Sequence, residues 1–519
     1  MMPDRITTME PESLTAPVQH DYNDPTVERN VERLRLWLTN LPLLDVVKTL
    51  RLVQGGLDSL NEQKLEPERR YQLLEVFRDT AERLYATVDP IYMRQLNLTS
   101  SQRELATAGL ERLLAAMAGG YKILVKTLYE SAAHGSPPVL FGQAIHRAIE
   151  QLGYVLLDNY RAYRTVPGSL FGELNQLYRL ARHFGLLAVC ATDNEAEQPH
   201  GTAECYHAIM LLSLTDPFRL AEGEVALLYE ILKTHAGACR VTPGNQWSGD
   251  SEGVFQLDLC SDSPPRRCSD LEHPAADVRE PYLLDARNML ASIGTQLERI
   301  PVRVRMQSPE AVLLRRLASG DMEAKQNREA RHPDSRQTML IIGLHAIHAR
   351  LLALRSGRST HAERETSTDP VGTLSCRIED SSDNGMRLVC EAGQSGDARV
   401  ADLVGILGEG HRLQLAITRS VQYQRSVGIE LGVQKIHGSC GPVYCRTLMD
   451  DATEEIEALF IPASEDEGVA ATLVTLNGFY EPGRRLLVNS FGREVKARAG
   501  RNISDSLLFD RFEFAVDDS

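Results

Sequence analysis

The sequence predicts an α+β multidomain protein, with an N-terminal all-α bundle followed by an antiparallel β-barrel and a smaller C-terminal β domain. Three observations lead to this fold class. The chain has 519 residues, enough for two to four domains with substantial cores. Helical periodicity dominates from Thr26 to about Val189. After Thr338, short apolar runs alternate with turn residues, which is typical of antiparallel strands.

Shifts in composition set the expected boundaries. The segment from Thr242 to Pro281 is rich in Gly, Ser, Pro and charge, and basic residues precede the first strand of the β half. We predict a flexible leader (1–25), a helical domain (26–240), a loop-rich segment with one strand and two helices (241–318), a linker carrying arginines (319–336), a β-barrel (337–450) and a C-terminal β domain (451–519).

The helices follow from apolar spacing and from helix-start signals. Pro42 should end a first helix, and a second should break at Gly55-Gly56. Ser100 or Ser101 is a suitable N-cap for the helix that carries Leu105 to Met117. Further helices are expected at 141–163, 169–184, 203–212, 222–235, 283–297 and 309–317.

The strands follow from short runs of β-branched and aromatic residues between turns. One lies in the loop-rich segment, at Val254 to Leu259, and a short helix at Leu344 to Leu352 should interrupt the later series. The strands of the expected barrel are 338–342, 373–379, 386–390, 403–407, 412–423, 427–436 and 442–448. Those of the C-terminal domain are 457–462, 470–476, 484–490, 494–499 and 507–515.

Composition narrows the function classes. The net charge of −15 argues against a nucleic acid polymer or an anionic membrane as the main partner, but allows a small anion in a local basic pocket. No apolar run approaches the roughly 18 residues of a spanning helix, so we expect no membrane insertion. No secretory signal is visible, and the nine cysteines contain no C-x-x-C pair. We therefore expect a cytoplasmic protein with reduced thiols.

The stretch from Cys376 to Cys390 carries the most specific signal. Two strand-like runs flank a polar tip, Asp380 to Gly385, in which Gly385 can take the positive φ of a tight turn and Asn384 tolerates it. Asp380 and Ser382 are two residues apart, so on an extended backbone both side chains project from one face. A carboxylate acceptor and a short hydroxyl there suit a polar ligand. A purely structural Asx-type turn is the alternative.

This tip resembles the D-x-S-x-x-G half of the signature of PilZ domains, the bacterial receptor modules for cyclic di-GMP. The other half in that family is an arginine pair upstream of the first strand, and this linker offers Arg328, Arg331 and Arg336. The run from Gly428 to Val433 is similar to the late PilZ strand, in which glycine permits close approach. The resemblance covers about Arg328 to Met449. It implies a PilZ-like antiparallel barrel that binds cyclic di-GMP through Arg328, Arg331, Arg336, Asp380, Ser382 and Gly385.

The arginines depart from the family pattern, R-x-x-x-R. Arg328 and Arg331 stand one residue too close together, and Arg331 and Arg336 stand one residue too far apart. Arginine forks bind phosphates and guanine edges, so linker arginines that trap a ligand against a barrel would also switch the conformation. Retained binding and a barrel that has lost its ligand both remain open.

Other constellations are weaker. His345 and His348 have a metal-compatible spacing but no fixed partner, so we expect no metal site. Cys205 and His207 are two apart on a helix and point away from each other. No catalytic motif is present, and we expect no cofactor.

Three hypotheses follow. The leading one is a non-catalytic cyclic di-GMP effector that changes its interdomain arrangement on binding and signals to an unidentified protein partner. The second is a ligand-free PilZ-like scaffold that acts through the helical domain. The third is an enzyme with its active site in the helical half, and no residue spacing supports it.

Overall fold

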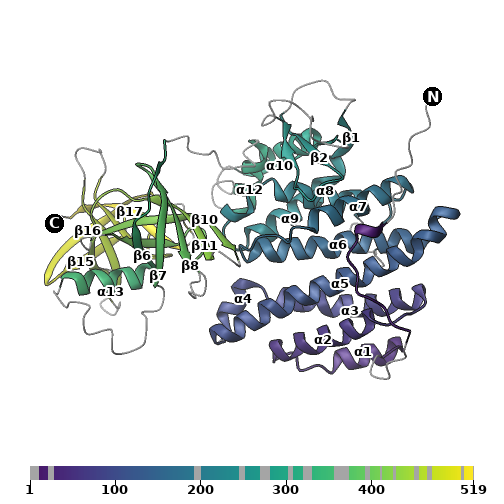
Figure 1. Cartoon of the computed structure of the whole chain (residues 1–519). Coiled ribbons are helices and arrows are strands. Elements are labelled where there is room, and N and C mark those ends of the chain that lie inside the picture. Colours follow the sequence, from purple (N-terminus) through teal and green to yellow (C-terminus); the bar gives the residue numbers. More distant parts are fainter. Residues whose placement is uncertain are drawn as a thin grey trace. The chain divides into compact units, whose positions relative to one another are not determined.

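The structure is a computed structural model of the whole chain. It describes residues 11–21, 28–96, 98–191, 200–244, 252–268, 281–301, 308–319, 330–355, 373–391, 398–408, 412–424, 428–448, 455–463, 470–503, 506 and 508–517. The chain divides into two compact units (Figure 1). Unit one comprises Met1–Pro217 and Glu222–Lys325, and unit two comprises Phe218–Ala221 and Gln326–Ser519.

Unit one is mainly helical, as predicted. Its helices are α1 (Val31–Thr39), α2 (Val46–Asn61), α3 (Pro67–Thr87), α4 (Pro90–Gln95), α5 (Ser100–His134), α6 (Val139–Arg161), α7 (Leu170–His183), α8 (Thr202–Ser213), α9 (Glu224–His235), α10 (Arg287–Arg299) and α12 (Pro309–Ala318). The long α5 and α6 pack side by side (Figure 1). The apolar stripe of α3, including Leu73, Phe77 and Leu84, is buried as its helical spacing requires.

Two helix details differ from the sequence-based expectation. The N-cap of α5 is Thr99, not Ser100 or Ser101: the Gln102 amide donates to the Thr99 hydroxyl at 3.2 Å, and Gln102 reaches back to the Thr99 amide. The second helix, α2, does not break at its glycines. Gly56 lies against the Trp37 ring, where an added Cβ would come within 3.1 Å of the ring, so this glycine serves close packing inside a continuous helix.

The loop-rich segment of unit one contains more sheet than predicted. The strands β1 (Arg240–Pro243), β4 (Pro281–Asp285), β2 (Val254–Asp258) and β3 (Arg266–Arg267) form a four-stranded sheet in that order. Only β2 was expected. The predicted helix start at Leu283 is wrong, because Pro281–Asp285 pairs with both β1 and β2 and the helix α10 begins at Arg287. Those backbone partners are distant in sequence and invisible to local periodicity.

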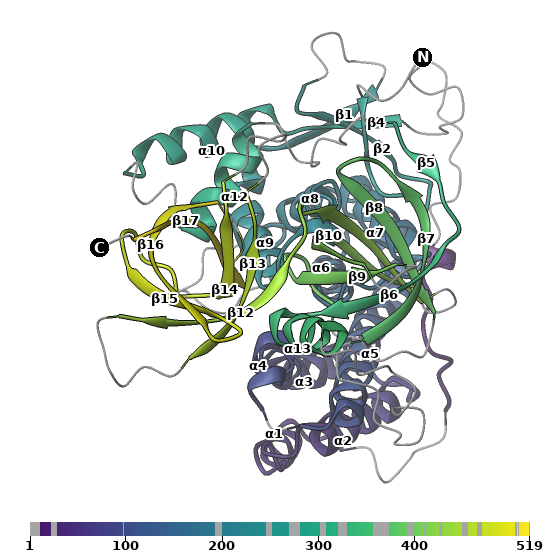
Figure 2. The same cartoon turned by 90° about the vertical axis from the view of Figure 1, so that its left-hand side faces the viewer.

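Unit two contains two closed antiparallel barrels (Figure 2). In the first, the ring runs β6 (Gln337–Ile342), β7 (Thr373–Ser381), β8 (Gly385–Glu391), β11 (Gly428–Lys435), β10 (Leu413–Gln424) and β9 (Leu403–Leu407), and back to β6. A short strand, β5 (His332–Pro333), pairs with Ser381 and Asp380 at the end of β7, past the residues of β7 that pair with β6. The helix α13 (Leu344–Arg355) follows β6, as the sequence predicted.

The second barrel is also six-stranded. It consists of β12 (Gly441–Thr447), β13 (Ile456–Ile461), β14 (Thr472–Leu476), β17 (Phe509–Val516), β16 (Arg493–Asn502) and β15 (Arg485–Ser490), in ring order. From its place in the sequence, the strand at 442–448 was predicted to belong to the first barrel. This assignment is wrong, because β12 pairs with β13 and β15. Each predicted strand of the β half occurs, with ends within three residues of the expected ones.

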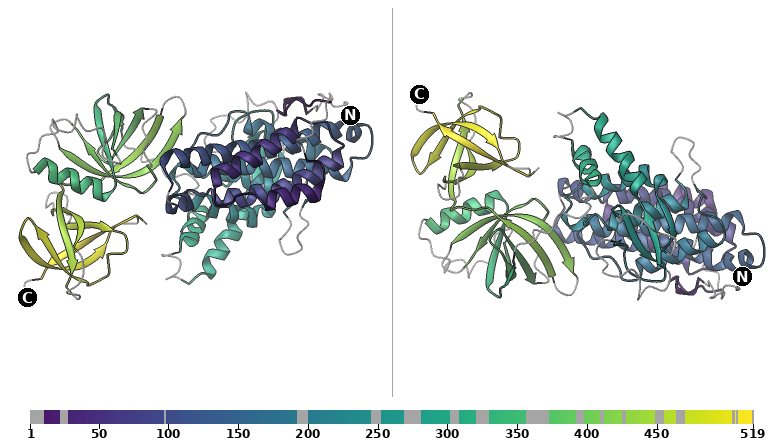
Figure 3. Two further views of the ribbon diagram at one scale, coloured as in Figure 1. Left: turned by 90° about the horizontal axis from the view of Figure 1, so that it is seen from below. Right: turned by 90° about the horizontal axis from the view of Figure 1, so that it is seen from above.

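The helix α13 lies between the two barrels (Figure 3), and a continuous apolar core around it joins them. Leu344 and Ile347 of α13 are buried together with Leu403 and Leu415 of the first barrel and with Leu459 of the second. Burying apolar side chains from α13 and from both barrels in one cluster opposes separation of the barrels. Unit two therefore offers a rigid base for any site on the surface of the first barrel.

One expectation about the cysteines is also wrong. Cys376 and Cys390 form a disulfide across β7 and β8, where the two residues face each other with Cα atoms 4.0 Å apart. The sequence predicted reduced thiols, because the cross-strand register of two cysteines cannot be read from their spacing. In the described part of the chain, no helix combines the length and apolarity needed to cross a bilayer.

Candidate functional site

The hairpin tip between β7 and β8 is closed by Ser382 and Gly385. The Ser382 amide donates to the Gly385 carbonyl at 2.9 Å, and the Gly385 amide donates to the Ser382 hydroxyl at 3.1 Å. Neither Asn384 nor Gly385 has a positive φ, contrary to the prediction. Glycine is favoured at position 385 because there is little room for a side chain. An added Cβ would lie 3.2 Å from the Val433 carbonyl on the neighbouring strand β11.

The tip is also anchored to the end of β11. The Lys435 amide donates to the Asn384 carbonyl at 2.8 Å, and the Lys435 ammonium donates to the Ser382 carbonyl. His437 Nε2 lies 2.8 Å from the Asn384 side-chain oxygen. Sequence reasoning missed Lys435 and His437, because they stand more than 50 residues after the turn and only the barrel brings them to it. These contacts make the tip a fixed platform.

A β-bulge aims Asp380 outward. Ile378 pairs with Leu388 and Asp380 pairs with Arg387, so Glu379 is an extra residue in β7. Leu374, Cys376 and Ile378 point into the barrel core, and without the bulge Asp380 would follow them inward. The bulge thus orients the Asp380 carboxylate, while the Ser382 hydroxyl accepts a hydrogen bond within the turn. The shared face of Asp380 and Ser382 stays a prediction.

The linker reaches this strand. His332 and Pro333 pair with Ser381 and Asp380, and the Asp334 amide donates to the Glu379 carbonyl at 2.9 Å. Just before them, Arg331 Nη1 donates to Asp380 Oδ1 at 2.7 Å. This contact joins two predicted site residues that stand 49 positions apart in the sequence.

The other two linker arginines are placed differently. Arg328 lies outside the described residues. Arg336 donates to the Asp334 carboxylate through Nε and Nη2, the latter at 2.6 Å, and the Arg336 amide donates to the same carboxylate at 3.0 Å. These hydrogen bonds lower the pKa of Asp334 to about 2. The structure thus brings Arg331, but not Arg336, into contact with the motif aspartate.

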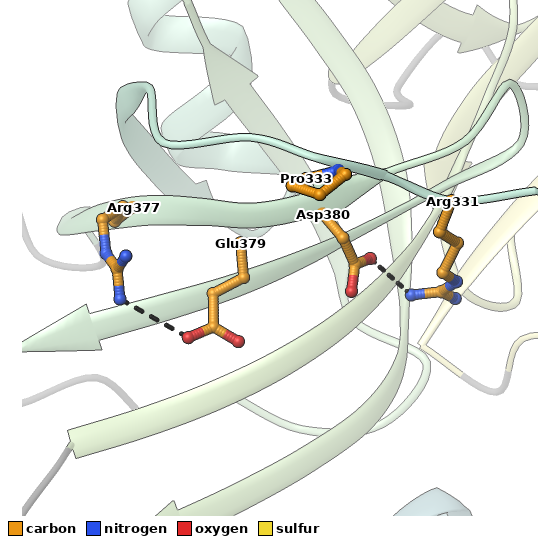
Figure 4. Close-up of a pocket in the computed structure, with 5 residues that line it drawn as sticks. All are labelled: Arg331, Pro333, Arg377, Glu379 and Asp380. Atoms are coloured by element: carbon orange, nitrogen blue, oxygen red, sulfur yellow. Dashed lines mark hydrogen bonds and ion pairs between the residues drawn. The ribbon is translucent and has the colours of Figure 1, made fainter.

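An open hollow of about 430 Å³ lies between the linker and β7 (Figure 4). It is lined by Arg331, Pro333, Arg377, Glu379 and Asp380. Arg377 Nη2 lies 3.4 Å from Glu379 Oε1, so the hollow contains two ion pairs side by side. The two guanidinium groups and the two carboxylates cancel in formal charge. Such a surface can bind an anion only by exchanging partners.

The ion pairs continue beyond the hollow onto neighbouring strands. Arg387 on β8 contacts Glu379 at 3.3 Å and Glu430 on β11 at 2.7 Å. The hydrogen bond to Glu430 is the main cause of a raised pKa of Arg387, which keeps this guanidinium charged. Sequence reasoning missed Arg377, Glu379 and Arg387, because their charges alternate along strands without forming a motif.

The late glycine strand has a packing explanation. Gly428 adopts a φ of +115°, and a Cβ on Gly432 would come within 2.4 Å of the Ser420 hydroxyl. Ser420 adjoins an irregularity in the pairing of β10 with β11. The close approach that was predicted for this strand therefore occurs, between strands of the barrel.

The remaining sequence candidates form no reactive group. His345 Nδ1 lies 2.6 Å from Glu457, and His348 is buried with Nε2 at 3.1 Å from the Val443 carbonyl. Among the described residues no cluster of metal-ligating side chains occurs. Burial raises the pKa of Cys205 to about 12 and lowers the pKa of His207 to about 4, so neither group is charged near neutral pH.

Comparison with known proteins gives consistent matches. Residues 32–245 match a family model described as the N-terminal domain of the cyclic-di-GMP receptor FimW, and residues 444–516 match the FimW C-terminal β-barrel domain. Together the two ranges cover more than half of the chain. A curated relative, the cyclic-di-GMP receptor FimW of Pseudomonas aeruginosa, is 23% identical over 97% of this chain and 93% of its own length. This chain belongs to the FimW family. No solved structure matches it.

The FimW matches follow the architecture. The N-terminal match begins in α1 and ends just after β1, and all of it except Phe218–Ala221 belongs to unit one. The C-terminal match begins in β12 and ends at the last residue of β17, so it coincides with the second barrel. The first barrel and its hollow lie between the two matched ranges.

Proposed function

We propose that the chain is a non-catalytic receptor for cyclic di-GMP, and that the nucleotide binds in the hollow between the linker and β7. Membership of the FimW family, whose named relative is a cyclic-di-GMP receptor, supports the ligand class. The observation that carries the location is the 2.7 Å contact between Arg331 and Asp380, which unites a linker arginine with the hairpin aspartate beside an open hollow.

The chemistry of these groups suits the ligand. Cyclic di-GMP presents two phosphodiesters and two guanines. A guanidinium fork matches both a phosphate and the O6 and N7 acceptors of guanine, and a carboxylate accepts from the guanine N–H donors. Arg331 would exchange the Asp380 carboxylate for the ligand, and Asp380 would then receive guanine donors. The turn residues Ser382 and Gly385 hold the platform on which Asp380 stands.

Binding at this place would also affect the linker. Arg331 immediately precedes β5, and β5 is held to β7 by short backbone pairing. A ligand that recruits Arg331 would therefore rearrange residues 330–336, which lead into the first barrel. We infer that this rearrangement changes the interdomain arrangement and signals to a protein partner. Arg328 and Arg336 remain predicted ligand residues, and Arg336 would have to leave Asp334 to take part.

Two observations favour a second function. The charges in the hollow already cancel within the chain, and the arginine spacing departs from R-x-x-x-R. A barrel of this kind could serve as a ligand-free interaction scaffold that acts through the helical unit.

Calorimetric titration of the purified full chain separates the two functions. With cyclic di-GMP we expect saturable heat at a 1:1 or 2:1 ratio of ligand to protein, no heat with cyclic di-AMP, and a strong loss of affinity in Asp380→Ala. If titration of the wild type with cyclic di-GMP gives no heat, the receptor hypothesis is excluded and the scaffold hypothesis remains. Unchanged affinity in Asp380→Ala would move the site elsewhere.

A further inference from the structure

Arg377 occupies a position in the hollow that no sequence motif indicated. It lies on β7, lines the hollow with Arg331, and points toward Glu379 (Figure 4). Arg377 and Asp380 are three residues apart, which corresponds to roughly 10 Å along a strand. The hollow therefore offers one guanidinium at each end, with the two carboxylates between them.

The two ion pairs of the hollow differ in strength. The Arg331–Asp380 contact is a hydrogen bond of 2.7 Å, and the Asp380 side chain is 23% exposed. The Arg377–Glu379 contact is 3.4 Å long, and the two side chains are 49% and 34% exposed. A long contact between exposed groups contributes little and is exchanged at small cost. Arg377 is thus the guanidinium that an incoming phosphate can recruit most readily.

The Glu379 carboxylate keeps a cationic partner when Arg377 moves to the ligand. Arg387 lies 3.3 Å from the other oxygen of the same carboxylate and is itself held by Glu430. The exchange therefore leaves no isolated charge in the strand. Arg336 differs from Arg377 in both respects. Its side chain and its amide both donate to Asp334, and it does not line the hollow.

We propose that Arg377, rather than Arg336, supplies the second guanidinium for a dianionic cyclic dinucleotide, and that Glu379 is the internal anion that the ligand displaces from it. This inference rests on the proposed function and names a ligand-contacting residue and a competitor within the same site. It accounts for the irregular linker spacing, since a site that takes one arginine from the linker and one from β7 does not need R-x-x-x-R.

Affinities of single variants test the assignment of Arg377. We expect Arg377→Ala to raise the Kd for cyclic di-GMP about 10- to 30-fold, the effect of losing a charge-assisted interaction. Arg336→Ala should change it less than about threefold. Arg419→Ala is the matched control, because Arg419 is an exposed barrel arginine bound to Gln434 and does not line the hollow; its Kd should equal that of the wild type.

A double-mutant cycle tests the role of Glu379. Glu379→Gln should lower the Kd about threefold when Arg377 is present, because the competing charge is gone, and by much less in the Arg377→Ala background. Far-UV circular dichroism confirms that each variant is folded. No binding by the wild type would remove both the receptor and this inference. Normal affinity in Arg377→Ala with a large loss in Arg336→Ala would overturn the inference alone, and an equal gain from Glu379→Gln in both backgrounds would overturn the displacement.

Discussion

Replacing Arg331 by alanine tests the contact on which the receptor proposal depends. The substitution removes the linker guanidinium that now donates to Asp380 at 2.7 Å. It leaves β5 intact, because the pairing of His332 and Pro333 with β7 uses the backbone. The Arg331 side chain is 46% exposed, so its loss creates no cavity. Any change in affinity then reports on the guanidinium itself.

The magnitude follows from an exchange of partners. In the free protein Arg331 has a surface ion pair, which contributes about 0–1 kcal/mol. In the complex it would form charge-assisted hydrogen bonds with the ligand, which contribute about 1.5–3 kcal/mol. The difference, about 2 kcal/mol, corresponds to a Kd about 30-fold higher in Arg331→Ala. Arg331→Lys keeps the charge but loses the fork, so its Kd should fall between those of the wild type and the alanine variant.

Isothermal titration with cyclic di-GMP at two salt concentrations is the assay. Because the lost interaction is ionic, the gap between the wild type and Arg331→Ala should narrow as salt rises. A Kd for Arg331→Ala within threefold of the wild type at low salt would refute the reasoning, since the linker would then contribute no ligand contact. Arg419→Ala serves as the control here too.

Three further predictions concern the fold and the linker. Burial lowers the pKa of His207 to about 4, so below about pH 6.5 the unfolded chain takes up a proton at His207 that the folded chain does not. Acid therefore destabilises the folded wild type. Between about pH 7 and pH 5 its free energy of unfolding should fall by about 2 kcal/mol more than that of His207→Gln. Glu173→Ala should destabilise unit one by about 3–5 kcal/mol in urea denaturation, because it leaves the buried Lys122 ammonium, now 2.9 Å from the carboxylate, without its counter-ion. Saturating cyclic di-GMP should change hydrogen exchange at the Asp334 and Ile378 amides, which donate across the linker and β7.

Each of these predictions has its own control. An identical pH dependence in His207→Gln would contradict the first. For the second, the double variant Lys122→Met with Glu173→Leu removes both charges and should recover much of the lost stability, and a loss as large as in the single variant would contradict the ion-pair explanation. For the third, unchanged hydrogen exchange at both amides under saturating ligand would exclude a rearrangement of the linker. It would not contradict binding of the nucleotide.

Local signals were sufficient for most elements of this chain. Apolar spacing predicted the helices of unit one, and short runs between turn residues predicted the strands of both barrels. They failed for Pro281–Asp285, which reads equally well as the start of a helix and becomes a strand only through β1 and β2. They also failed for the strand Gly441–Thr447, since sequence order does not reveal which barrel a strand closes.

The sequence by itself determined the fold class and the hairpin tip with its aspartate, because both depend on residue types at short spacing. Only the tertiary structure decided what surrounds Asp380. An extra residue at Glu379 turns the carboxylate outward, the linker strand delivers Arg331 from 49 positions away, and strand pairing places Arg377 in the hollow. Such groups meet through long-range backbone pairing and through a bulge that reverses the inward and outward alternation, and neither leaves a periodic trace in the sequence.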